Sequence, residues 1–273
     1  MNSRNRIYAA ICLLIIGFSF ASFQSKNDKT EKLHALVMER LAKASETDDF
    51  DLLEKTITEI APQLGETDTL ALLYHRLGAM YFNHDLEFKA LGHYKKALDI
   101  RQRVLKPNDF DLTKTLQGYG RTLARVRRLE EAVPLLAENL KIRQATLPPQ
   151  SDSIAEALMI YGGVFNESGN YAMAIRLIQQ SIDIFQKNQR DTNRLAYAFQ
   201  YIGVAYAKAK TQDKAVQSFL KSIALMQYIK DTKGESECNH NIGVLLTEQN
   251  KYAEALPYFQ NARSEERRVG KEC

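Results

Sequence analysis

Two clusters of residues in the sequence have types that could do chemistry. Residues 118–120, Gly-Tyr-Gly, resemble part of a dinucleotide-binding loop, but the third glycine and a preceding strand pattern are missing. His75, His84 and His93 could hold a metal ion, yet their spacing of nine residues does not place three imidazoles on one helix face. We therefore expect the glycines to serve in packing and the histidines to be solvated or to line a groove.

The remaining reactive residues do not form an active site either. Residues 46–51 are acidic, but they lack the glycine and the final glutamate of a calcium-binding loop. Of the three cysteines, only Cys238 lies in the body of the chain, so no disulfide framework can form. No serine, histidine and aspartate, and no cysteine and histidine, are arranged for catalysis. The sequence predicts no catalytic residue, no metal site and no cofactor.

The charge of the chain gives no reason to expect a nucleic acid partner. The formal charge is +4 over 273 residues, and Arg4 and Arg6 contribute +2 of it. The last 11 residues contribute +1, which leaves +1 for residues 22–262. A nearly neutral body lacks the concentrated basic surface that binds phosphates.

The strongest pattern in the sequence is a unit of 40–42 residues that occurs five times. In each copy a glycine is followed twelve residues later by an alanine. Large apolar residues stand three residues after the glycine and four after the alanine. The glycines are Gly78, Gly120, Gly162, Gly203 and Gly243, and the alanines are Ala90, Ala132, Ala174, Ala215 and Ala255. Apolar residues at helical spacing on both sides of a turn predict two antiparallel helices per copy, packed through the small residues.

One such helix pair cannot bury its apolar face alone, so the copies must stack. We therefore predict an all-α fold, a right-handed superhelical solenoid of antiparallel helix pairs. Leu77-Gly78-x-x-Tyr81, followed by Ala90-x-x-x-Tyr94, resembles the core pattern of the tetratricopeptide repeat family. The resemblance covers residues 71–262. Because the family unit has about 34 residues, this longer unit is similar to the kinesin-light-chain type that is also found in exported bacterial proteins. The additional residues should lengthen the second helix of each pair and the linker.

The sequence also suggests boundaries for the repeat array. Residues 22–61 contain a degenerate helical pair, in which Leu41 replaces the glycine, and residues 62–68 should be a linker. The five repeats then occupy residues 62–262. Within them, Ser153 is predicted to start a helix through a capping box with Glu156.

The first 21 residues resemble an export signal. Two arginines precede the apolar stretch Ile7–Phe20, and small residues favour cleavage after Ala21. An uncleaved membrane anchor is the alternative. In both cases the body of the chain should lie outside the cytoplasmic membrane, in the periplasm. Any further contact with the membrane would require a part of the protein beyond Ala262.

The last 11 residues, RSEERRVGKEC, differ from the rest of the array. Only Val269 among them is substantially apolar, so they cannot cover the final repeat. They also resemble the translation of a short-read sequencing adapter. We therefore expect residues 263–273 to be non-native.

The resemblance implies where a ligand would bind. In tetratricopeptide repeats the first helix of each pair lines a concave groove that holds a protein or peptide. Polar, charged and aromatic residues on that face are His75, Arg76, Asn83, Lys114, Gln117, Arg121, Arg125, Glu156, Asn166, Glu167, Tyr197, Gln200, Tyr201, Glu237, His240, Asn241 and Glu248. The N-terminal half of this set is basic and suits an acidic segment, whereas the C-terminal half is acidic and aromatic.

Two functions agree with these sequence features. The first is a non-catalytic, extracytoplasmic scaffold that binds a protein or peptide. The second is the sensor part of a larger signalling protein, since related arrays often precede a histidine kinase, a DNA-binding domain or a caspase-like protease. We expect the first, and sequence beyond Ala262 would distinguish the two.

Overall fold

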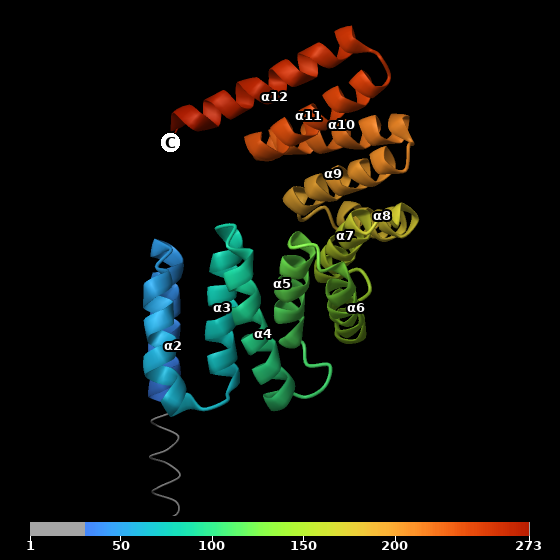
Figure 1. The fold of residues 1–273 in the computed structure, drawn as a ribbon. Helices are drawn as coiled ribbons and strands as arrows, with labels where there is room; N and C mark the ends of the chain where they lie inside the picture. The colour runs from blue at the N-terminus through green and yellow to red at the C-terminus, as the bar shows by residue number, and fades with distance from the viewer. Residues whose placement is uncertain (1–30, 273) are drawn as a thin grey trace, which may run out of the picture. The chain divides into compact units, whose positions relative to one another are not determined.

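The computed structural model describes residues 31–272, which form helices joined by short turns (Figure 1). They divide into two compact units, one ending at Pro107 and one beginning at Asn108. No strand occurs between residues 31 and 272, so the predicted all-α solenoid of helix pairs is confirmed. Over the same range, no helix is both long enough and apolar enough to cross a membrane. The predicted signal, residues 1–21, lies outside the described residues.

The first unit contains two helix pairs. A helix over residues 31–47 pairs with α2 (Phe50–Leu64), and α3 (Asp68–Asn83) pairs with α4 (Glu87–Val104). Leu41, which stands in place of the repeat glycine, is buried. The helix α2 continues through Pro62 to Leu64, so the linker is shorter than the predicted residues 62–68.

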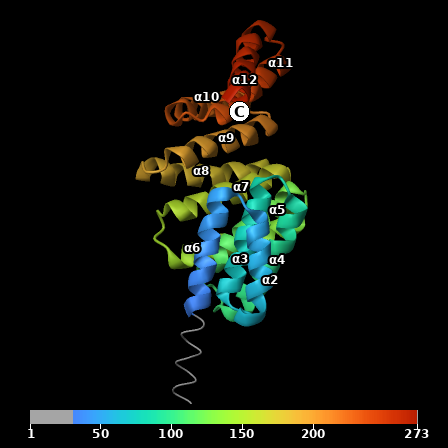
Figure 2. The same ribbon diagram turned by 90° about the vertical axis from the view of Figure 1, so that its left-hand side faces the viewer.

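The second unit contains four helix pairs that follow one another in chain order (Figures 1 and 2). They are α5 (Leu112–Arg125) with α6 (Leu129–Thr146), α7 (Asp152–Glu167) with α8 (Tyr171–Asn188), α9 (Thr192–Lys208) with α10 (Gln212–Ile229), and α11 (Thr232–Glu248) with α12 (Tyr252–Glu272). The helices α4, α6, α8 and α10 each have 18 residues, against 14 to 17 in the helices that precede them. The residues beyond the usual unit thus lie in the second helices. The predicted boundary at Ala262 falls inside α12.

The repeat glycines lie where the two helices of a pair approach most closely. A Cβ atom built on each glycine would lie 2.5–3.1 Å from a side chain of the partner helix. That side chain is the large residue four positions after the repeat alanine, such as Ile178 opposite Gly162. The five repeat alanines are themselves 0–2% exposed. The repeat glycine, the repeat alanine and the large residue four positions after the alanine therefore form one contact, which recurs in every repeat.

The turn between the two helices has the same geometry in all five repeats. The residue seven positions after each glycine has a left-handed backbone, with φ between 57° and 82°. The next residue donates its backbone N–H to the carbonyl five positions earlier, at 2.9–3.0 Å. These are the features of a Schellman turn. The left-handed residues are Asp85, Arg127, Gly169, Lys210 and Asn250.

The start of α7 differs from the prediction. The N-cap is Ser151, whose hydroxyl accepts a hydrogen bond from the backbone of Ser153. Ser153 is already inside the helix, and its carbonyl and hydroxyl both accept hydrogen bonds from Arg143. The predicted capping box of Ser153 and Glu156 is therefore wrong, because these residues join α7 to α6.

The first unit contains a stack of aromatic rings that includes His93. The imidazole lies 5.4 Å from the ring of Tyr81 and 6.1 Å from that of Tyr74. Phe50 of α2 also stacks on Tyr81, with the ring centres 4.9 Å apart. Burial, with Lys96 and Lys89 nearby on α4, lowers the pKa of His93, and Glu54 on α2 only partly opposes this. The Nδ1 atom of His93 has no hydrogen-bond partner among the described residues.

This environment predicts that acid destabilises the first unit. The unfolded chain takes up a proton at His93 near the ordinary pKa of 6.5, whereas the folded chain does so only at lower pH. Between these two values the unfolded state binds more protons, so stability is complete above pH 6.5 and falls as the pH drops below it. Chemical denaturation from pH 7.5 to pH 5 should therefore show a loss of stability that is smaller in His93→Leu. An equal loss in His93→Leu would contradict this role, and His84→Leu is the control at an exposed histidine.

Candidate functional site

The first helices of the second unit form a continuous layer. The helix α7 contacts both α5 and α9, and α9 contacts α11. We call the solvent-exposed surface of these four helices the first-helix face. The predicted groove residues from Lys114 to Glu248 lie on these four helices, whereas His75, Arg76 and Asn83 lie on α3 in the first unit.

The three residues of the first unit are accessible to different degrees. Arg76 and Asn83 are exposed, and Asn83 is the last residue of α3. His75 is half-buried, and its ring lies edge-on to Tyr94 at 5.5 Å. His75 therefore contributes to packing within its own repeat.

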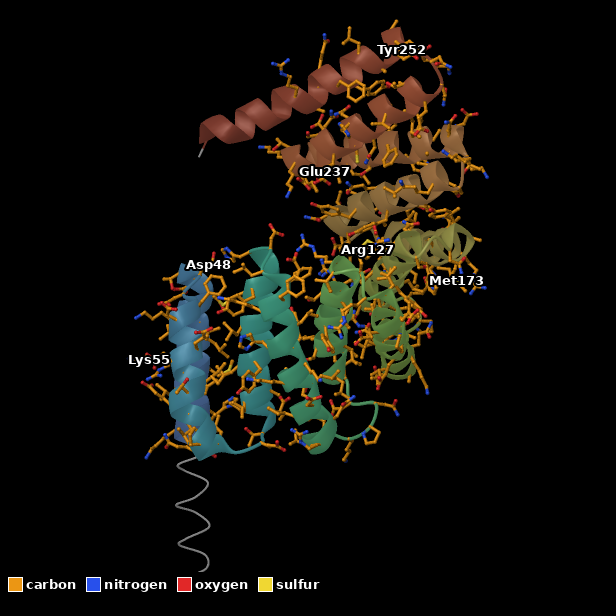
Figure 3. All side chains as sticks on the ribbon, viewed as in Figure 1. Asp48, Lys55, Arg127, Met173, Glu237 and Tyr252 are labelled. Atoms are coloured by element: carbon orange, nitrogen blue, oxygen red, sulfur yellow. The ribbon has the colours of Figure 1, made fainter. Side chains whose placement is uncertain are left out.

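The basic end of the first-helix face is α5. Lys114, Arg121 and Arg125 are exposed on this helix at intervals of one or two turns. A fourth basic residue, Arg127, follows in the turn and makes an ion pair with Glu167 at the end of α7 (Figure 3). Glu167, which was predicted to line the groove, thus joins two repeats.

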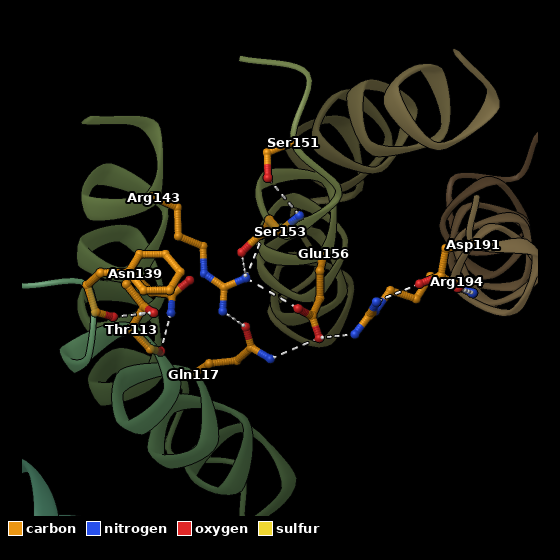
Figure 4. Close-up of polar contacts among 10 residues, drawn as sticks. Thr113, Gln117, Asn139, Arg143, Ser151, Ser153, Glu156, Asp191 and Arg194 are labelled. Carbon is orange, nitrogen blue, oxygen red and sulfur yellow. Dashed lines mark hydrogen bonds and ion pairs between the residues drawn. The ribbon is translucent and has the colours of Figure 1, made fainter. Parts of the chain in front are cut away.

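Gln117 and Glu156 belong to a polar network centred on Arg143 of α6 (Figure 4). The Arg143 side chain is 5% exposed, and one of its terminal nitrogens donates to Gln117 at 2.7 Å. The other lies 2.6 Å from the Ser153 carbonyl and 3.3 Å from the Glu156 carboxylate. Glu156 also pairs with Arg194 of α9 at 3.5 Å. The network therefore connects three successive repeats.

This network changes the prediction for its members. Burial lowers the pKa of Arg143, and the nearby Glu156 carboxylate opposes the shift. Because a guanidinium stays charged in proteins, Arg143 is a buried cation that needs these acceptors. Gln117 and Glu156 are used to bind it, so they are not free to hold a ligand. The equivalent of Arg143 in α4 is Arg101, which is also buried and pairs with Asp68 at 2.9 Å, whereas α8 and α10 have Phe185 and Met226 there. An arginine at this position of two repeats is the signal that could have identified Arg143.

Asn166 is also used within the protein. It is 9% exposed, and its amide donates to the backbone carbonyl of Tyr201 at 3.0 Å. Its prediction as a groove contact is wrong, because the side chain instead fixes α7 against α9. Tyr197 donates its hydroxyl to Asp231 at 2.6 Å, and burial and this bond raise its pKa.

The centre of the first-helix face is apolar and aromatic. Tyr201 and Val244 are each 38% exposed. The residues at the equivalent positions of the preceding repeats, Ile160 and Val204, are half-buried. The Tyr201 ring packs 3.7 Å from the position of a Cβ atom on Gly163. Val204 and Val244 stand one residue after their repeat glycines, in the column that contains Arg121, so the sequence pattern could have identified them.

The acidic end of the face is α11. Gln200 of α9 donates to Glu237 at 2.9 Å, and Glu248 is exposed at the end of the helix. Figure 3 labels Glu237 on this helix. His240 is exposed and lies edge-on to Phe259 at 5.7 Å, and Asn241 is half-buried. Across the second unit, the face thus runs from basic through aromatic to acidic.

Comparisons with known proteins agree with this architecture. A tetratricopeptide repeat model matches residues 69–145, and a second such model matches residues 237–268. No curated protein matches the sequence.

Solved structures with similar folds cover most of the chain. BtubC (BKLC) from P. vanneervenii is 19% identical, with a TM-score of 0.64 over 86% of this chain and 92% of that one. The apo form of RapI is 11% identical, with a TM-score of 0.66 over 87% and 99%. A putative kinesin light chain from Podosopora anserina, with nearly identical repeats, is 16% identical, with a TM-score of 0.60 over 74% and 98%. At these identities the likeness concerns the fold.

The family models and the recurring glycine–alanine contact support the same assignment. The solved structures share the helix-pair repeats and include a kinesin light chain. Residues 69–145 and 237–268 are therefore tetratricopeptide repeats, and the helix pairs between them share the same glycine contact.

Proposed function

We propose that this protein is a non-catalytic scaffold that holds an extended segment of a partner protein along its first-helix face. The observation that carries the proposal is the exposed pair of Tyr201 on α9 and Val244 on α11, with Lys114, Arg121 and Arg125 exposed on α5 of the same face. Tyrosine and arginine are enriched at protein interfaces. The partner segment should place acidic residues at α5 and apolar residues at α9.

Photo-cross-linking tests this proposal. A benzoylphenylalanine in place of Tyr201 should give discrete adducts with a partner in cells of the source organism. The same residue in place of Tyr228 is a demanding control, because Tyr228 on α10 is 79% exposed and would favour random collisions. Equal adducts from both positions, or none from position 201, would exclude a partner on the first-helix face.

The basic residues provide the second arm of the test. Arg121→Glu with Arg125→Glu should abolish the adduct at position 201, because the charge that attracts the acidic segment is reversed. The adduct of the unchanged protein should weaken as salt is added. Persistence of the adduct in the double variant would show that the segment binds without these arginines.

We propose further that the scaffold works outside the cytoplasmic membrane. The support is the pattern of residues 1–21, in which two arginines precede a long apolar stretch. Mass spectrometry of the protein from a periplasmic fraction should give a mature chain that starts at Ser22. A full-length chain in the cytosol would overturn the proposal.

A further inference from the structure

The second helices of the second unit leave a groove between α8 and α10, with α9 as its floor. The helices α8 and α10 each pack on α9, but no Cα atoms of the two approach within 8 Å. A cavity of about 250 Å³ lies in the groove. Small-molecule sites usually measure about 300–1,000 Å³. The cavity therefore suits one or two side chains of a partner better than a whole small molecule.

The groove contains two lysines that lie over aromatic rings. The ammonium nitrogen of Lys214 is 5.6 Å from the ring centre of Tyr206, and that of Lys221 is 5.4 Å from the ring centre of Phe199. Cation–π contacts at this distance favour the orientation of both ammonium groups at the groove. In the described part of the chain neither lysine makes an ion pair. The cavity lining contains glutamines and a serine but no carboxylate.

A matching set of two aromatic residues and two lysines occurs once more in the chain. The first set is Tyr74, Tyr81, Lys89 and Lys96, and the second is Phe199, Tyr206, Lys214 and Lys221. Each residue of the second set follows its counterpart by 125 positions, which is also the distance from Gly78 to Gly203. The ammonium groups again lie over the rings, Lys89 at 5.1 Å from Tyr81 and Lys96 at 5.3 Å from Tyr74. Repeats two, three and five lack the two lysines.

In the first unit the preceding helix supplies a carboxylate to this arrangement. The hydroxyl of Tyr81 donates to Glu54 of α2 at 2.5 Å. Leu41 and Gly162 occupy the same position in their repeats. The residue thirteen positions later is Glu54 in the first unit and Ile175 in the second. In the second unit the equivalent position is thus apolar. The Tyr206 hydroxyl has no hydrogen-bond partner among the described residues.

We propose that the groove between α8 and α10 is a second binding site, which takes carboxylate side chains from an acidic segment of a partner protein. The partner carboxylate would accept from the Tyr206 hydroxyl, as Glu54 does from Tyr81, and would pair with Lys214 and Lys221. Charge complementarity supports this occupant, because the lining carries two positive charges and no negative one. The site lies on the second helices and is independent of the first-helix face.

Fluorescence anisotropy with a labelled hexaglutamate peptide tests the proposal. The titration uses the full chain with Arg121→Gln and Arg125→Gln, so that binding at the first-helix face does not contribute. In this background, Lys214→Gln with Lys221→Gln should weaken binding about tenfold at low salt, because charge-assisted contacts are lost. Tyr206→Phe, which keeps the ring, should weaken it roughly threefold. Lys141→Gln with Lys251→Gln removes two exposed lysines elsewhere and should have no effect.

The outcomes separate this site from the proposed function. Unchanged affinity without Lys214 and Lys221, or an equal loss in the Lys141 and Lys251 control, would overturn the second site. Loss of peptide binding on changing Arg121 and Arg125 alone would also count against it, while leaving the first-helix proposal intact. Thermal melting of each variant shows whether a loss reflects unfolding, and the expected melting temperatures are unchanged.

Discussion

Replacing Arg143 with alanine should lower the free energy of unfolding by about 3 kcal/mol or more, the cost of breaking a buried ion pair. The guanidinium is almost fully buried and donates to Gln117, Ser153 and Glu156 on two other helices. Without it, these acceptors lose their donor and the space is left unfilled. Urea denaturation of the variant and the parent protein measures the difference.

Two further variants make this result specific to the buried network. Arg143→Met with Glu156→Leu should recover much of the loss, because apolar residues often replace a buried pair at little cost. Methionine already occupies the equivalent position 226 in α10. Arg128→Ala breaks an exposed pair with Glu131 and should leave the melting temperature unchanged. A stability loss below about 1 kcal/mol in Arg143→Ala would mean that the network does not hold the repeats together.

Replacing Gly162 with leucine should cost about 1–3 kcal/mol or more, because the contact between α7 and α8 has no room for a side chain. A Cβ atom at this position would lie 2.5 Å from Ile178 and 3.2 Å from the backbone oxygen of Ala174. The backbone oxygen cannot move without separating the helices.

The adjacent Gly163 is the matched control in the same helix. A Cβ atom there would meet the Tyr201 ring at 3.7 Å, an ordinary contact distance. Gly163→Ala should therefore stabilise the protein by up to about 1 kcal/mol, through the higher helix propensity of alanine. Equal melting temperatures for Gly162→Leu and the parent protein would remove Gly162 from the packing contact.

The sequence by itself was sufficient to predict the helix pairs and their family. Glycine and alanine recur with fixed spacing because two helices can approach closely only where both are small, and this constraint acts within forty residues. The apolar columns follow from the same local packing. Residues such as Lys114, Arg121 and Tyr201 could be assigned to one helix face because helical periodicity determines the direction of each side chain.

Other features depend on residues that meet only in the folded chain. The turn residues Arg127 and Lys210 adopt a left-handed backbone that their types do not favour. Helix packing on both sides of the turn imposes this conformation, as it does at Gly169. A sequence pattern identifies the glycine at such a turn but not the arginine or the lysine.

The roles of the polar residues were also decided by tertiary structure. The resemblance to tetratricopeptide repeats placed Gln117, Glu156 and Asn166 toward the groove, but it could not show that a neighbouring repeat supplies their partners. Arg143 reaches two of them because burying a guanidinium requires acceptors from every helix around it. The lysine–aromatic groove likewise joins α9 and α10. Periodicity fixes the direction of a side chain, whereas the distance to its partner depends on how the repeats stack.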